Sequence, residues 1–336
     1  MVYWFFCGWI RWCRYFYFSA FKVYHFPEQW KNSTVQAKPR IFCANHPSSF
    51  LDPILVATVV PFQLGFLARG DAFTPIFNRF LRSQFRMMPV WRDREGFGNV
   101  RKNYGTFELC LERWKSDDSI IIFSEGLCVQ EWKLRPLSKG SARLVLQAVQ
   151  AGIPLEIVPV GINYGHFHGP GKAADLRFGK PVQAADLLEE LRSSGAMELV
   201  SLHSEMSDAE TARWLLSFNR WLKDAMSPLV VQAIDEQEVF QNSASGLSVQ
   251  GTVTSPFLLL LSRLLHAPWY RPIRSWIMNL CRDTVHFDAV LFAVLMVTYP
   301  LYLTLVGLVL WNFIGAWSMP ALMFWPLTAW LARRGA

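Results

Sequence analysis

One short polar segment of the sequence carries residue types that could move a proton. His46 follows Asn45 after a short apolar run, residues 41–44, and Asp52 comes six positions after the histidine. Neutral imidazole is well suited to take a proton from an alcohol near pH 7, and a carboxylate on its other ring nitrogen fixes the tautomer. The spacing predicts His46 as a general base that Asp52 orients. A capping Asn45 with a structural histidine and a helical aspartate is the alternative.

The nucleophile is expected to come from the substrate. No Gly-x-Ser-x-Gly elbow occurs in the chain. Ser48 and Ser49 are the only hydroxyls near His46, and both are interpreted as turn residues. A substrate hydroxyl is therefore a simpler nucleophile than a serine of the protein.

The segments that surround His46 alternate between apolar patterns typical of strands and apolar patterns typical of helices. Short apolar runs typical of buried strands occupy residues 41–44, 63–68, 87–91, 119–123 and 155–162. Helical spacing is found over residues 51–60, 71–86, 100–115, 141–151 and much of 183–240. Strands separated by helices, bounded by Gly and Pro, predict an α/β fold with a mixed sheet flanked by helices.

The first residues of the chain are aromatic and apolar. Residues 1–23 are expected to form a helix that carries Arg11, Arg14 and Lys22 on one face, because Lys22 lies about three turns after Arg11. Aromatic rings and a cationic face are typical of a helix lying in a membrane interface. A signal anchor and a buried core helix are the alternatives.

The last part of the chain is predicted to lie in a membrane. No charged residue occurs from 289 to 332, and these 44 residues are roughly twice the length that spans a bilayer core. Asn312, Gly315 and Pro320 interrupt the middle, which favours two helices joined by a short turn, with a re-entrant hairpin as the alternative. Basic residues flank the stretch on both sides, so both ends are expected in the cytoplasm; these are Arg271, Arg274, Arg282, Arg333 and Arg334.

Composition agrees with a membrane protein. Apolar residues make up 52% of the chain and aromatic residues 15%, with a net charge of +7. Basic surface beside many aromatic residues favours a phospholipid membrane as partner over nucleic acid, for which no motif is found. The six cysteines are scattered, and His166 and His168 lack a nearby carboxylate, so neither a disulfide framework nor a metal site is expected.

Five segments follow from these patterns. We expect a membrane-interface helix at 1–26, a catalytic core at 27–182, a helical extension and linker at 183–254, an interfacial helical segment at 255–288, and a transmembrane or re-entrant hairpin at 289–332. The predicted location is the cytoplasmic (inner) membrane, with the catalytic core facing the cytoplasm.

The segment at His46 resembles the Asn-His-x-x-x-x-Asp signature of the glycerophospholipid acyltransferase superfamily, which includes lysophosphatidate and glycerol-3-phosphate acyltransferases. Three further blocks stand in that family's order: Met-Pro-Val-Trp-Arg at 88–92, Phe-Ser-Glu-Gly at 123–126, and Val-Pro-Val at 158–160. The resemblance covers residues 41–182 and implies the acyltransferase αβ sandwich. Each block is weak alone, but four in order are specific.

The resemblance also implies the roles of further residues. It implies that Arg92, or Arg94 nearby, binds the acceptor's phosphate, and that Glu125 holds the acceptor's polar head. Asn45, Ser124, Gly126 and Lys139 are implied to contact substrate, and Pro159 to shape the acyl pocket. Two positions depart from the family: Ser124 replaces a usual proline, and residues 127–128, Leu-Cys, stand where many members have Thr-Arg.

The implied reaction is direct acyl transfer. His46 would remove a proton from the acceptor hydroxyl, which attacks an acyl thioester carried by coenzyme A or acyl carrier protein. Backbone N–H groups around His46 or Gly126 are expected to stabilise the oxyanion, and no cofactor is expected. The acceptor would be glycerol phosphate or a lysophospholipid. The altered block after Gly126 leaves open another acceptor, such as an acyl-amino-acid lipid, or a degenerate lipid-binding protein.

Overall fold

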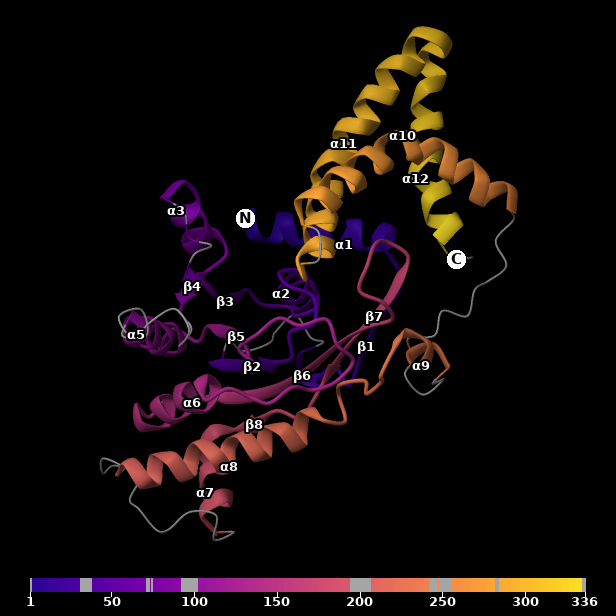
Figure 1. The fold of residues 1–336 in the computed structure, drawn as a ribbon. Helices are drawn as coiled ribbons and strands as arrows, with labels where there is room; N and C mark the ends of the chain where they lie inside the picture. The colour runs from indigo at the N-terminus through magenta and orange to yellow at the C-terminus, as the bar shows by residue number, and fades with distance from the viewer. Residues whose placement is uncertain are drawn as a thin grey trace.

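A mixed sheet runs through the middle of the molecule (Figure 1). The computed structural model describes residues 2–30, 38–70, 73, 75–91, 102–193, 207–241, 247, 256–281 and 284–333. The strand order is β1-β7-β6-β2-β5-β3-β4, with β8 paired to β6. The pairs around β2, β5 and β3 are parallel, whereas β6 runs antiparallel to β7 and β8. The strands are β1 (Phe18–Tyr24), β2 (Arg40–Ala44), β3 (Leu64–Arg69), β4 (Met87–Val90), β5 (Ser119–Phe123), β6 (Glu156–Tyr164), β7 (Lys172–Phe178) and β8 (Val182–Gln183).

Helices cover both faces of this sheet, as a mixed α/β fold requires. On one face lie α1 (Val2–Tyr17), α2 (Leu51–Ala57) and the start of α11 (Phe287–Ile314). On the other lie α5 (Lys102–Lys115), α6 (Gly140–Gln150), α7 (Ala184–Ser193) and α8 (Asp208–Met226). The remaining helices are α3 (Pro75–Gln84), α9 (Glu236–Gln241), α10 (Pro256–Leu280) and α12 (Ser318–Arg333).

The strand β2 shows why the sequence builds two layers. Successive side chains of a strand point to opposite faces. Phe42 and Ala44 pack in the cluster with α1, α2 and α11, whereas Ile41 and Cys43 pack in the cluster with α5 to α8. All four are fully buried, so β2 is apolar from Ile41 to Ala44, as expected for a central parallel strand covered on both faces.

The N-terminal helix is shorter than the sequence predicts. It ends at Tyr17, and residues 18–24 form strand β1, which pairs in parallel with β7. Lys22 therefore lies in a strand, and the prediction that it shares a helical face with Arg11 and Arg14 was wrong. These two arginines contact the end of α2: Arg11 Nε donates to the Thr58 carbonyl at 2.6 Å, and Arg14 Nη1 donates to the Thr58 hydroxyl at 3.3 Å.

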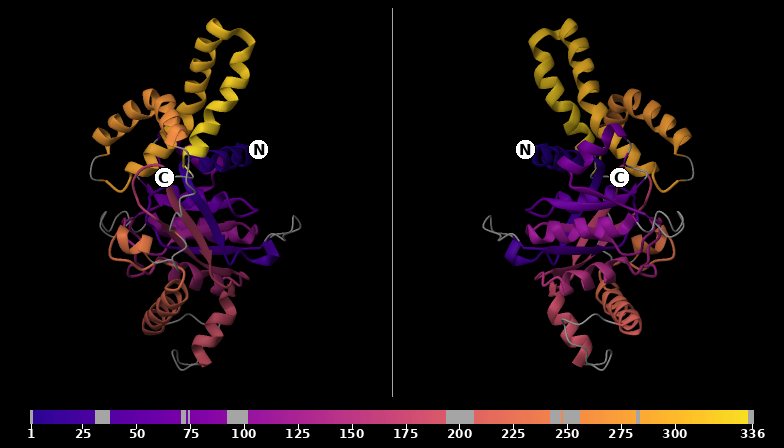
Figure 2. Two further views of the ribbon diagram at one scale, coloured as in Figure 1. Left: turned by 90° about the vertical axis from the view of Figure 1, so that its right-hand side faces the viewer. Right: turned by 90° about the vertical axis from the view of Figure 1, so that its left-hand side faces the viewer.

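The C-terminal helices α10, α11 and α12 gather beyond α1 and extend away from the sheet (Figures 1 and 2). The short turn Gly315–Trp317 joins α11 to α12, where Gly315 has a φ of +54°. By length and composition, one apolar stretch, Phe287–Thr328, is long enough to cross a membrane. Side chains along it are exposed, among them Leu301, Leu305, Phe313, Trp317 and Met323.

A buried ion pair joins the N-terminal end of α11 to the rest of the fold. Asp288 is fully buried and forms an ion pair with Lys172 of β7, which is also fully buried. The Tyr17 hydroxyl donates to Asp288 Oδ1 at 2.5 Å, and the Gly169 N–H donates to the same oxygen at 2.8 Å. Burial lowers the pKa of Lys172, and Asp288 opposes that shift. The contacts therefore unite α1, β7 and α11 at one point.

Candidate active site

His46 and Asp52 meet at the carboxyl end of β2. His46 Nδ1 lies 2.8 Å from Asp52 Oδ2. The Asp52 side chain is fully buried, whereas the imidazole is 18% exposed. Phe123 at the end of β5 stacks on the imidazole, with ring centroids 3.9 Å apart. A carboxylate on Nδ1 keeps the proton of a neutral imidazole there and leaves Nε2 as the acceptor.

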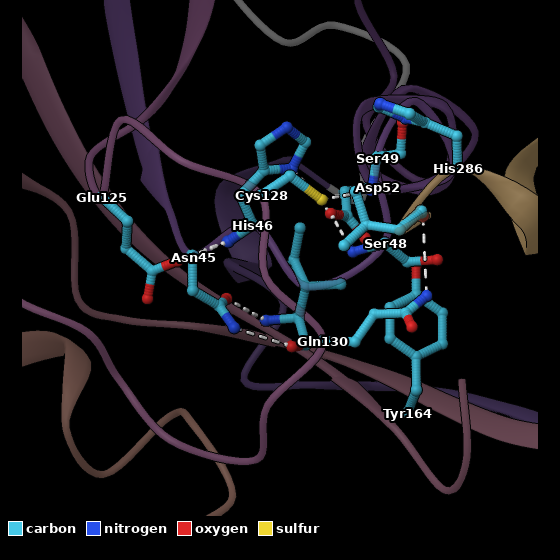
Figure 3. A network of polar contacts seen from close by, with 12 residues as sticks. Asn45, His46, Ser48, Ser49, Asp52, Glu125, Cys128, Gln130, Tyr164 and His286 are labelled. Carbon is cyan, nitrogen blue, oxygen red and sulfur yellow. Dashed lines mark hydrogen bonds and ion pairs between the residues drawn. The ribbon is translucent and has the colours of Figure 1, made fainter. Parts of the chain in front are cut away.

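Two more groups donate to the Asp52 carboxylate. The Tyr164 hydroxyl donates to Oδ1 at 2.7 Å, and the Ser48 N–H donates to Oδ2 at 2.8 Å (Figure 3). Burial, and then the charge of Asp52, raise the pKa of Tyr164 well above its usual value. The phenol therefore remains a donor throughout the neutral range, and Asp52 is held in place by a side chain from β6.

The spacing of the first motif differs from the family signature by one residue. Five residues, 47–51, separate His46 from Asp52, so the four-residue spacing in the signature does not hold here. Ser49 has a φ of +51°, a left-handed conformation that is uncommon outside glycine. This compact turn accommodates the longer segment, so that Asp52 in the first turn of α2 still reaches His46.

Glu125 joins the two loops of the site. Its Oε2 accepts from the His46 N–H at 3.0 Å, and its Oε1 accepts from the Arg135 N–H at 2.9 Å. The side chain lies beside the His46 turn (Figure 3). Burial raises the pKa of Glu125, and the two backbone N–H donors oppose that rise. Both carboxylate oxygens thus accept from backbone N–H groups, one at His46 and one at Arg135.

Asn45 and Ser124 are buried and have partners within the protein. Asn45 donates to the Ile162 carbonyl at 2.9 Å and accepts from the Ile162 N–H at 2.7 Å, which extends the β2–β6 pairing beyond the strand. The Ser124 hydroxyl lies 2.8 Å from that of Ser141. Both side chains thus hold neighbouring loops together, and their contact with substrate stays a prediction.

The other residues implied by the motifs fall in different places. Gly126 has a φ of +69° in the turn after β5, and Lys139 is exposed at the start of α6. Pro159 packs against Gly179, on the face of β6 opposite that of Val158, Val160 and Tyr164. The structure therefore does not bring Pro159 to the His46–Asp52 side of the sheet. Arg92 and Arg94 lie outside the described residues.

The N–H groups expected to stabilise an oxyanion are already paired. The Ser49 N–H donates to Cys128 Sγ at 2.9 Å, and the Gly126 N–H donates to the Phe123 carbonyl at 3.0 Å. The N–H groups of His46 and Ser48 donate to Glu125 and Asp52, as described above. Each of these four N–H groups has an acceptor within the protein, so the source of the oxyanion donors around His46 or Gly126 stays a prediction.

Two residues of the site, Tyr164 and His286, were missed in the sequence, and a third, Cys128, was noted only as a departure from the family motif. Tyr164 lies at the carboxyl end of β6, next to β2 in the sheet. Carboxyl ends of neighbouring parallel strands meet at one edge, so a polar residue following the Val-Pro-Val block was an available signal. The other two, Cys128 and His286, contact Ser49: the Ser49 hydroxyl lies 2.6 Å from His286 Nδ1. No local pattern marks His286, which precedes α11 and is 237 residues from Ser49.

Comparisons with known proteins find a family model and a solved structure that match this chain. Residues 25–163 match the family model described as Acyltransferase. Among solved structures, the 1-acyl-sn-glycerophosphate acyltransferase PlsC from Thermotoga maritima matches with 18% identity and a TM-score of 0.38, over 61% of this chain and 71% of that chain. The comparison with curated proteins finds no match. The matched segment contains His46, Asp52 and Glu125 and all four motif blocks in full, so residues 25–163 are an acyltransferase domain by that family model.

Proposed function

We propose that this chain is a membrane-bound O-acyltransferase that moves a fatty acyl group from a thioester to the hydroxyl of a glycerol-phosphate or lysophospholipid acceptor. The observation that carries the proposal is the relay from Tyr164 through Asp52 to His46, with contacts of 2.7 and 2.8 Å. Such a relay suits a general base, and the family match supplies the reaction class. The donor is acyl-coenzyme A or acyl carrier protein.

In the proposed mechanism His46 acts through Nε2. This nitrogen takes the proton of the acceptor hydroxyl as its oxygen attacks the thioester carbonyl carbon. The carbon–sulfur bond then breaks, and the thiolate leaves with the proton that the imidazolium returns. Asp52 holds Nδ1–H and stabilises the imidazolium. Glu125 fixes the turn that carries the base.

We propose further that the domain works at the cytoplasmic surface of the inner membrane. The exposed apolar side chains of α11 and α12 support this placement, and so do exposed aromatic residues on α1, among them Trp4, Phe5 and Tyr15. Basic residues flank α11 and α12, which favours both ends on the cytoplasmic side. A lipid acceptor would then reach the site from the bilayer that holds the enzyme.

A second acceptor class is supported by one position. Cys128 occupies a place where many family members have arginine, and its sulfur accepts from the Ser49 N–H beside the catalytic turn. A thiol there offers no positive charge to a phosphate. An acceptor without a phosphomonoester, such as an acyl-amino-acid lipid, fits this change with the same chemistry.

The deciding experiment measures acyl transfer by the full chain in membranes with labelled thioester. His46→Ala is expected to lower the rate about 100-fold or more, the usual contribution of a general base. His25→Ala is the matched control, because that histidine is exposed after β1, and it should keep the wild-type rate. Near-normal activity of His46→Ala would reject the base assignment.

An acceptor screen separates the candidate functions. The purified wild-type chain is offered glycerol 3-phosphate, a lysophosphatidate and an acyl-amino-acid lipid with hydroxyls. Transfer to a phosphate acceptor supports the first proposal, and transfer confined to the aminolipid supports the second. If no acceptor is acylated with either thioester, the protein is a lipid-binding relative rather than an enzyme.

A further inference from the structure

A cavity of about 600 Å³ lies between α1, α10 and α11, away from the catalytic turn. Its lining includes Cys13, Phe16 and Tyr17 of α1 and excludes His46, Asp52 and Glu125. The volume falls within the range of about 300–1,000 Å³ that small-molecule sites occupy. The cavity therefore has the size of a ligand site, and it is lined by none of the residues to which the proposed acyl transfer assigns a chemical role.

The inner wall of the cavity is apolar. Phe292, Leu295 and Met296 of α11 are buried in the core cluster and line it. The polar groups in the wall are mostly bound to each other: His266 Nε2 lies 3.1 Å from the Tyr299 hydroxyl, and His266 Nδ1 lies 2.9 Å from the Ser262 carbonyl. A hydrocarbon chain suits such a wall, because it leaves no buried polar group to be satisfied.

The rim is cationic. Arg263, Arg271 and Arg274 of α10 line the cavity and are exposed. Their spacing of eight and three residues puts them within about 80° on one side of the helix. Among the described residues, no carboxylate forms an ion pair with any of the three, and no Asp or Glu lines the cavity. Guanidinium groups bind phosphate oxygens through paired N–H donors.

We propose that this cavity binds one anionic phospholipid of the bilayer, with an acyl chain against Phe292, Leu295 and Met296 and its phosphate against Arg271 and Arg274. An apolar wall beside a cationic rim matches a molecule with a hydrocarbon chain and a phosphate. The bilayer is the source, because the wall is formed by α11 itself, whose exposed apolar side chains, such as Leu301 and Leu305, continue beyond the cavity.

The test uses the full chain in phosphatidylcholine micelles and phosphatidylglycerol with a photoreactive group in its acyl chain. Illumination is expected to label peptides of α1 and α11 that line the cavity. Unlabelled phosphatidylglycerol should compete, and added phosphatidylcholine should not. Equal competition by the two lipids would overturn the proposal, and so would stronger competition by palmitoyl-coenzyme A, which would identify the cavity as a donor site.

Two variants separate the rim from the wall. Arg271→Gln with Arg274→Gln is expected to weaken labelling about tenfold through the loss of charge-assisted hydrogen bonds. The control Arg143→Gln with Lys180→Gln removes the same charge from exposed positions outside the cavity and should label as wild type. Ala267→Trp fills the cavity from α10 and should abolish labelling. Undiminished labelling of the arginine pair or of Ala267→Trp would reject the site, provided each variant keeps the His46-dependent transfer that reports an intact fold.

Discussion

At the scale of single residues, the turn from His46 to Asp52 depends on hydrogen bonds that come from distant parts of the chain. Tyr164 is 112 residues from Asp52, and its hydroxyl is one of the donors that hold the carboxylate. A hydrogen bond to a charged group contributes about 1.5–3 kcal/mol. The orientation of His46 therefore rests on strand β6 as well as on its own turn.

Replacing Tyr164 by Phe tests this positioning role. Without the phenol, Asp52 loses a donor and holds the imidazolium of His46 more strongly, so the acid limb of the pH–rate profile is expected to move to higher pH. The maximal rate should fall about tenfold, with KM for the thioester little changed. A rate loss without movement of the acid limb would indicate a packing defect instead. Tyr104→Phe, at an exposed site on α5, is the control.

Arg92 gives a prediction that rests on the sequence alone. The family resemblance implies that its guanidinium binds the acceptor's phosphate, so Arg92→Glu should raise KM for a phosphate acceptor much more than KM for the thioester. Steady-state kinetics with each substrate varied in turn will measure both constants. Equal changes in the two would contradict the phosphate role, and Arg94→Glu shows which of the two arginines holds it.

At the scale of elements, the sequence predicts the local patterns and misses the distant pairings. The parallel strands β2 and β5 and helices α5 and α6 have clear apolar periods, and they form close to the predicted positions. Strand β1 was missed because its aromatic residues continue the composition of α1, and its partner β7 is far away in the sequence. Strand β7 carries Lys172 and Asp175, both buried, and buried charges conceal the usual apolar pattern of a strand.

In the candidate site, too, local features can be predicted from the sequence and long-range contacts cannot. The pairing of His46 with Asp52 can be predicted from the sequence because only six positions separate them, and Glu125 can be predicted from its motif. The contacts of Ser49 with Cys128 and His286 cannot be predicted from the sequence. They depend on how the loop after β5 and the start of α11 pack against the turn before α2. Such long-range contacts are determined by tertiary packing and leave no periodic pattern in the local sequence.

The buried ion pair between Asp288 of α11 and Lys172 of β7 gives a prediction about how these elements are held together. Asp288→Asn leaves the Lys172 ammonium buried without its carboxylate, which is expected to cost about 3–5 kcal/mol in unfolding free energy. Lys172→Met together with Asp288→Asn removes the unpaired charge and should recover much of that loss. Denaturant unfolding of the detergent-solubilised chain will measure the differences. A double variant no more stable than Asp288→Asn would show that the charge pair is not the cause.

At the scale of the whole molecule, the exposed apolar surfaces lie on one side of the sheet. The helices α11 and α12 extend from the face that α1 and α2 cover, opposite the face that α8 covers (Figure 2). A large exposed apolar surface in a folded protein marks contact with a membrane or another protein. The turn from His46 to Asp52 is on the same side as this surface, because α2 packs in the cluster with α1 and α11.

A sidedness experiment tests the proposed membrane placement. Trp317 lies in the turn between α11 and α12 and is exposed, as is Tyr104 on α5. A membrane-impermeant maleimide is expected to label Trp317→Cys only from outside sealed membranes and Tyr104→Cys only from inside, after subtraction of wild-type labelling. Labelling of both from the same side, or of Trp317→Cys from neither side, would exclude two full spans and favour a re-entrant hairpin.

In the proposed acyl transfer, the buried pair of Asp288 and Lys172, which fixes the start of α11, would affect which hydroxyl is acylated. One residue before α11, His286 contacts Ser49 in the turn between His46 and Asp52, so a direct contact joins this turn to the start of the apolar helix. With α11 in a bilayer, that connection sets the height of Nε2 above the hydrocarbon. A lipid acceptor also presents each hydroxyl at a definite height. The protein would then select a hydroxyl by its depth in the bilayer, before any side chain recognises the headgroup.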